Sequence, residues 1–122
     1  MVRRNFPMVK RRNSYPVRHN EKMRGGEGVV ISEKLLSPEE IYEKGRLFSK
    51  MTLHPGASIG YHVHEGEMES FFIISGEAEY SDNGEVVTLM PGDTVLNASG
   101  EGHSIKSTGD TPLELIALII FC

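Results

Sequence analysis

The chain has 122 residues, of which 39% are hydrophobic and 25% are charged, a composition typical of one globular domain. Its longest apolar run, residues 115–122, is far shorter than the ~20 residues that a membrane-spanning helix needs, and its one cysteine, Cys122, cannot form an intrachain disulfide. The formal net charge of −4 disfavours nucleic acid as the main partner. We therefore expect one domain in the cytoplasm, with neither a membrane nor a nucleic acid as partner.

The first 24 residues differ from the rest of the chain in charge. They contain eight basic side chains and one acidic side chain, a charge of +7 that leaves −11 for the remainder. Pro7 and Pro16 divide this segment into short extended pieces, which suit an edge strand or a crossing arm. Two interpretations stay open: a frayed, solvated tail, or an arm that packs on the folded domain or on a partner subunit. The apolar residues available for packing are Phe6, Met8, Val9, Tyr15 and Val17. We expect residues 1–24 to form the arm and residues 25–122 the domain.

One short helix and a series of strands are predicted after Gly25. A strand is expected at 29–31. Ser37 and Glu40 then have the spacing of a capping box, with Pro38 between them, and Gly45 stands where a helix of about two turns would end. Beyond it, runs separated by turn signals predict strands at 47–53, 59–64, 70–74, 78–81, 85–89, 94–97, 103–107 and 113–121. Many short, evenly spaced strands predict an all-β sandwich or barrel.

Four residues indicate a metal site. His62 and His64 occupy positions i and i+2 of a predicted strand, so their imidazoles share one face. Glu69 follows after a turn-like link, and His103 begins a strand far downstream. Three imidazoles and one carboxylate suit a divalent transition metal and leave positions open for water or substrate. His54 lacks a converging partner and is interpreted as an ordinary surface histidine.

Two stretches resemble a known family. The pattern Gly56-(x5)-His62-x-His64-(x4)-Glu69-(x6)-Gly76 is similar to the first cupin motif at every position, and residues 92–103 are similar to the second, with Ala98 in place of the usual proline. The resemblance covers about residues 45–121. It implies an all-β, double-stranded β-helix (jelly-roll) barrel with a metal bound by His62, His64, Glu69 and His103. Strand alternation then predicts that Phe71, Ile73 and Ile105 face inward, whereas Tyr61 and Val63 point away.

The resemblance also implies a function. Short one-barrel cupins of this kind are similar to oxalate decarboxylase-like members, which implies direct metal chelation, and possible conversion, of a small oxygen-rich carboxylate. The enzyme would be a decarboxylase or dioxygenase with manganese as the first expectation, and iron, nickel or zinc as alternatives. However, the arginine that oxalate-handling cupins carry three residues before the first metal histidine is Ile59 here. No catalytic residue is therefore assigned. A non-catalytic ligand-binding or sensor cupin, or a sugar isomerase, is the alternative.

Further side chains are candidates for the rim of the site and for a subunit interface. Those close to the ligands in sequence are Tyr61, Glu65, Glu67 and Ser99. Arg46 and Lys50 share a strand face and offer positive charge, although a solvated basic face is the simpler interpretation. The apolar run 115–121 lacks alternation, which predicts a strand buried on both faces, one of them against a second subunit. With the family's usual assembly, this predicts a homodimer.

Overall fold

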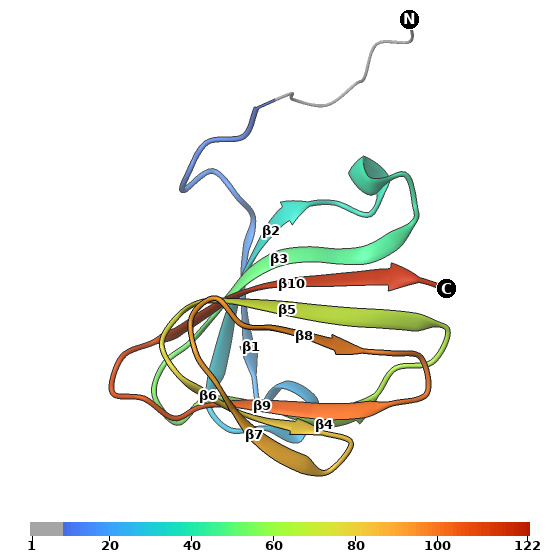
Figure 1. Cartoon of the computed structure of the whole chain (residues 1–122). Coiled ribbons are helices and arrows are strands. Elements are labelled where there is room, and N and C mark those ends of the chain that lie inside the picture. The colour runs from blue at the N-terminus through green and yellow to red at the C-terminus, as the bar shows by residue number, and fades with distance from the viewer. Residues whose placement is uncertain (1–8) are drawn as a thin grey trace, which may run out of the picture.

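The computed structural model describes residues 9–122. These residues fold into two antiparallel sheets (Figure 1). The six-stranded sheet contains, in spatial order, β1 (Val17–Glu21), β2 (Val29–Leu36), β3 (Gly45–Leu53), β10 (Leu113–Phe121), β5 (Glu67–Ser75) and β8 (Thr94–Asn97). The four-stranded sheet contains β4 (Ser58–Val63), β9 (Gly102–Ser107), β6 (Ala78–Asp82) and β7 (Glu85–Leu89). The predicted all-β class and jelly-roll arrangement are confirmed.

The hydrophobic core lies between the two sheets. Phe71 and Ile73 of β5 and Ile105 of β9 are at most 1% exposed, whereas Tyr61 and Val63 of β4 are about half exposed. The predicted inward and outward orientations of these strands are therefore confirmed. No helix among residues 9–122 is long and apolar enough to span a membrane.

The N-terminal segment supplies part of the larger sheet. Residues 17–21 form β1, an edge strand that pairs with β2 in antiparallel register. The 3₁₀ turn η1 (Met23–Gly25) follows and lies against β4. Val9 and Val17, two of the apolar residues considered for packing, are 62% and 55% exposed. The predictions for Phe6, Pro7 and Met8 fall outside the described residues.

The predicted two-turn helix is wrong. The capping box forms, because the Ser37 N–H donates to Glu40 Oε1 at 2.8 Å and the Glu40 N–H donates to Ser37 Oγ at 3.2 Å. Only the single 3₁₀ turn η2 (Glu39–Ile41) follows it. Tyr42 leaves the helical region with φ 57°. Gly45 begins β3, where an added Cβ would lie 2.1 Å from the carbonyl oxygen of Ile119. This glycine is therefore required for close strand packing, not for a helix end.

Strand β10 is not buried on both faces within one chain. Leu113, Leu115, Ala117 and Ile119 are buried and alternate with residues that are only partly covered or exposed. The strand is central, paired with β3 on one side and β5 on the other. The sequence does not show this alternation of buried and less buried positions, because most outward-facing residues of the strand are apolar as well.

Candidate metal centre

Three strands bring the four predicted ligands together. His62 lies on β4, Glu69 on β5 and His103 on β9, while His64 directly follows β4. His62 and His103 are directly opposed in the β4–β9 pair. One nitrogen or carboxylate oxygen from each of the four residues lies within 4.8 Å of all the others. His64, Glu69 and His103 are at most 4% exposed, so the donor atoms meet inside the fold.

A β-bulge in β4 directs the first two histidines inward. Ile59 pairs with Ile105, but His62 pairs with His103, so β4 has one residue more than β9 in this interval. Without the extra residue, strand alternation would place Ile59 and His62 on opposite faces. With it, both side chains line the same pocket. The bulge contains Gly60, whose carbonyl oxygen accepts a hydrogen bond from His62 Nδ1 at 2.7 Å.

The donor atoms fit a cation. His64 Nδ1 donates to Glu67 Oε1 at 2.7 Å, and His103 Nδ1 lies 2.8 Å from the Tyr80 hydroxyl. Neutral rings that donate through Nδ1 carry a lone pair on Nε2. The Nε2 atom of His62 then faces Nε2 of His64 at 3.0 Å and Nε2 of His103 at 3.2 Å. Three lone pairs and one carboxylate directed at one point are the donor set of a divalent transition metal.

Charge at the centre comes from Glu69. Its Oε1 lies 2.9 Å from Nε2 of both His64 and His103. Burial raises the pKa of Glu69, whereas hydrogen bonds from His103 and His62, donated when no metal occupies the site and their Nε2 atoms carry a proton, lower it to about 2. The residue is therefore a carboxylate at neutral pH, as a metal ligand must be.

Side chains around the ligands hold the rings in place. Tyr80 of β6 is 2% exposed, and burial raises the pKa of its hydroxyl, so the hydroxyl stays neutral beside His103. Phe71 stacks on the His103 ring, with a ring distance of 5.3 Å and an interplanar angle of 12°. Outer contacts of this kind orient metal-binding imidazoles and raise their basicity.

The loop before His103 is braced by the β6–β7 hairpin. Asn83 Oδ1 accepts from the Gly102 N–H at 3.0 Å, and Asn83 Nδ2 donates to Glu101 Oε2 at 3.0 Å. Glu101 Oε1 also accepts from the Ala98 N–H at 2.7 Å. A proline at position 98 would lack this donor. A hydrogen bond therefore fixes the turn in which this chain departs from the usual cupin motif.

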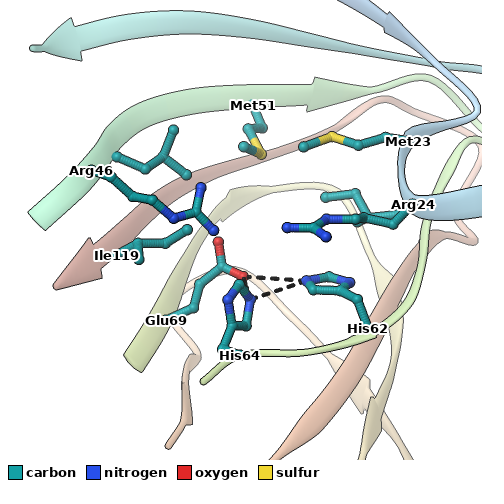
Figure 2. Close-up of a pocket in the computed structure, with 10 residues that line it drawn as sticks. Met23, Arg24, Arg46, Met51, His62, His64, Glu69 and Ile119 are labelled. Atoms are coloured by element: carbon teal, nitrogen blue, oxygen red, sulfur yellow. Dashed lines mark hydrogen bonds and ion pairs between the residues drawn. The ribbon is translucent and has the colours of Figure 1, made fainter. Parts of the chain in front are cut away.

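The pocket beside the ligands contains two arginines (Figure 2). It has a volume of about 70 Å³, and Met23, Leu47, Met51, Ile59 and Ile119 form its apolar walls. Figure 2 shows the guanidinium groups of Arg46 and Arg24 pointing into the pocket, near Glu69 and His62. Arg46 also binds Glu67 through two hydrogen bonds of 2.8 and 2.7 Å. This pairing lowers the pKa of Glu67 to about 2, against the opposite effect of burial.

Not all of the predicted rim residues lie at the pocket. Glu67 contacts His64, and Arg46 lines the pocket, but Lys50 forms an ion pair with Glu114 at 2.6 Å and does not line it. Arg46 and Lys50 do not share a face, because β3 has a bulge at Arg46. Ile119 of β10 pairs with Leu47 and the next residue, Ile120, pairs with Gly45, so Arg46 is the extra, unpaired residue. The remaining three rim residues lie outside the pocket: Tyr61 and Glu65 are exposed, and Ser99 accepts from the Gly66 N–H at 2.9 Å.

Arg24 is a pocket residue that the sequence analysis missed. It was counted in the charge of the N-terminal segment, and no motif singles it out. The turn that carries it lies close to β4, where an added Cβ on Gly60 would lie 2.2 Å from the Arg24 carbonyl oxygen. The neighbouring pair Gly25-Gly26 is the sequence signal of such a close approach.

Comparison with known proteins identifies the family. Residues 49–120 match the family model described as the cupin domain. The chain belongs to the cupin family. This cupin is 46% identical over 113 residues to the oxalate-binding protein of Thermotoga maritima, which covers 93% of each chain.

Two further relatives differ widely in similarity. The crystal structure of a predicted oxalate decarboxylase from Thermotoga maritima superposes on this cupin with a TM-score of 0.91 and 45% identity, covering 94% of this chain and 100% of that one. The xanthan biosynthesis protein XanB of Xanthomonas campestris is 33% identical over 67 residues, which are 55% of this cupin but only 14% of XanB.

Proposed function

We propose that this cupin binds a divalent transition metal through His62, His64, Glu69 and His103 and holds a small dicarboxylate such as oxalate on that metal. The observation that carries the proposal is the convergence of these donors beside a pocket with two guanidinium groups. When bound, the metal would supply the positive charge on which two ligand oxygens chelate. The similarity to an oxalate-binding protein over 93% of both chains supports this ligand class.

Arg24 supports the same ligand class. In oxalate-handling cupins, the first motif resembles this one except for an arginine at the position of Ile59. Ile59 lines the pocket here as an apolar wall, and Arg24 enters the same pocket from a different part of the chain. A guanidinium matches the geometry of a carboxylate and binds it more strongly than a neutral donor would. The charge is thus present, although its place in the sequence has changed.

The pocket favours binding over conversion. Among the described residues, the titratable side chains that line it are the two arginines and three of the four proposed ligands. Arginines remain protonated at neutral pH, and groups that bind the metal are not free to transfer protons. Glu67 is nearby but is held by Arg46 and His64. We therefore propose a binding protein first. A manganese- or iron-dependent decarboxylase or dioxygenase is the second candidate, supported by the similarity to the predicted oxalate decarboxylase.

Metal content and oxalate binding test the proposal. We expect protein purified without added metal to contain close to one transition-metal ion per chain, and calorimetry to show oxalate binding to the metal-loaded form alone. His103→Ala should lose most of the metal, since it removes one of four ligands, whereas the matched control His54→Ala, at an exposed histidine, should keep it. Metal binding unaffected by His103→Ala would contradict the site.

Turnover assays separate the two candidate functions. The manganese- and iron-loaded proteins are incubated with oxalate, and carbon dioxide, formate and hydrogen peroxide are measured. The binding function predicts tight oxalate binding without product. Product formation that disappears in Glu69→Gln would instead establish the enzyme. Manganese as the natural metal and the cytoplasm as the compartment stay predictions.

We also infer a homodimer. An apolar strip crosses β10, β5 and β8 on the outer face of the six-stranded sheet. Ile116 of β10 is paired with Phe72 of β5, and Ser70 of β5 lies between Leu118 of β10 and Leu96 of β8. Phe72 is 46% exposed and Leu96 is 62% exposed in the single chain. A connected apolar surface of this kind is typical of a protein interface.

A further inference from the structure

We propose that the ligand of this site is longer than oxalate: a chelating 2-hydroxy or 2-oxo acid whose second carboxylate lies in a basic chamber beside the metal pocket. The inference rests on the proposed metal-dependent binding of a carboxylate. It concerns the part of the ligand that does not touch the metal.

The chamber lies over the inner face of β1, β2 and β3. It has a volume of about 490 Å³, several times that of the metal pocket. Cross-strand pairs define its floor, because Arg18 is opposite Ser32, Ser32 is opposite Met51, and Lys34 is opposite Ser49. These side chains share a face with core residues such as Leu53, and all five of them line the chamber.

Polar and cationic side chains line the chamber, with Arg18 and Lys34 exposed at its outer part and Ser49 buried. Inward positions on a strand are normally apolar. Ser49, however, is only 2% exposed and lines the chamber. The lining contains three cations, Arg18, Lys34 and Arg46, and no carboxylate. Arg46 is paired with Glu67, whereas neither Arg18 nor Lys34 forms an ion pair within residues 9–122. Two positive charges are therefore available for an anion.

The chamber adjoins the metal pocket. Met23, Arg46, Leu47 and Met51 line both. Figure 2 shows Met23 and Met51 next to each other at the edge of the metal pocket, opposite the proposed ligands. Methionine side chains are flexible and adapt to the shape of what they contact. In the proposed complex, a molecule bound at the metal extends past these two side chains into the chamber.

The dimensions indicate a longer acid. Neighbouring strands lie about 4.8 Å apart, so the backbone at Arg18 is roughly 10 Å from that at Met51. Oxalate chelated to a metal has no group left to cross this interval. An acid with two or three additional carbon atoms and a terminal carboxylate reaches toward Arg18 and Lys34, which offer charge-assisted hydrogen bonds.

Matched pairs of acids test the inference. The manganese-loaded full-length protein is titrated calorimetrically with oxalate, 2-hydroxypentanedioate and 2-hydroxypentanoate; the last two differ only in the terminal carboxylate. We expect the diacid to bind at least about tenfold more tightly than the monoacid. The double variant Arg18→Gln/Lys34→Gln should abolish this difference and leave the Kd of oxalate unchanged. The control Arg11→Gln/Lys22→Gln removes the same charge outside the chamber and should preserve the difference.

Each result decides between the proposals. Equal affinity for the diacid and the monoacid, or a preference that survives Arg18→Gln/Lys34→Gln, would overturn the chamber while oxalate binding upholds the metal site. A preference lost equally in both double variants would show a general effect of net charge and would also overturn it. If neither oxalate nor the longer acids bind the metal-loaded protein, the proposed function fails and this inference fails with it.

Discussion

Each proposed histidine ligand is oriented by a different acceptor. His62 uses a backbone carbonyl, His64 a carboxylate and His103 a phenolic hydroxyl. The ligands themselves could be predicted because their spacing follows strand geometry and a specific motif. Tyr80 and Arg24 could not, because their approach to the site depends on which strands and turns become neighbours. Sequence spacing identifies residues that share a strand, whereas contacts between distant strands require the register.

Tyr80 provides a test at the level of single residues. Tyr80→Phe removes the hydroxyl beside His103 Nδ1 and keeps the ring in the core. We expect metal affinity to fall by about tenfold or more, because removing such an outer contact typically costs that much. A competition titration with a chelator of known affinity measures it. Tyr61→Phe is the control, since that ring is 54% exposed. Equal affinities in the two variants would show that the hydroxyl does not orient His103.

At the level of elements, bulges determine which side chains enter the site. Strands 85–89, 94–97 and 113–121 have the predicted bounds, the strand predicted at 29–31 extends to Leu36, and the other predicted strands differ by one to three residues at their ends. The segment 17–21, considered only as an edge strand or an arm, forms β1. The bulges at Gly60 and Arg46 were not predicted, because no strong local signal in the sequence marks them. Each inserts one extra residue, which moves every later side chain of the strand to the opposite face of the sheet. This is why Arg46 and Lys50 were wrongly expected to share a face, although Arg46 itself was a predicted rim residue and lines the pocket.

Gly60 makes the bulge in β4 testable. An alanine Cβ there would lie 2.2 Å from the Arg24 carbonyl oxygen and 2.9 Å from the Gly26 nitrogen, both backbone atoms. Gly60→Ala should therefore displace the turn that carries Arg24 and lower the free energy of unfolding by about 1–3 kcal/mol. Thermal or denaturant unfolding measures the change. Gly109→Ala is the matched control, because its Cβ would meet side-chain and backbone atoms at 3.5 Å or more. Similar stabilities of both variants would argue against close packing at Gly60.

For the whole molecule, assembly is the property to be measured. The apolar outer face of the six-stranded sheet predicts a dimer by sedimentation at micromolar concentration. Leu96→Glu should shift the mass toward one chain, because a charge would be buried in the interface without a partner. Val86→Glu is the control, since Val86 on β7 of the other sheet is 61% exposed, close to the 62% of Leu96. A monomeric wild-type protein would contradict the homodimer.

The position of β1 couples the ligand to the folding of the chain's first strand. β1 pairs with β2 alone, so it has half the strand contacts of a central strand. Strands held by few contacts open at a lower free energy than the core does. Yet β1 carries Arg18, and the turn after it carries Arg24. An anion that binds both arginines adds contacts to this edge strand and stabilises it by a free energy that rises with the logarithm of ligand concentration above the Kd. The fraction of molecules in which β1 is paired with β2 therefore rises with the concentration of the acid.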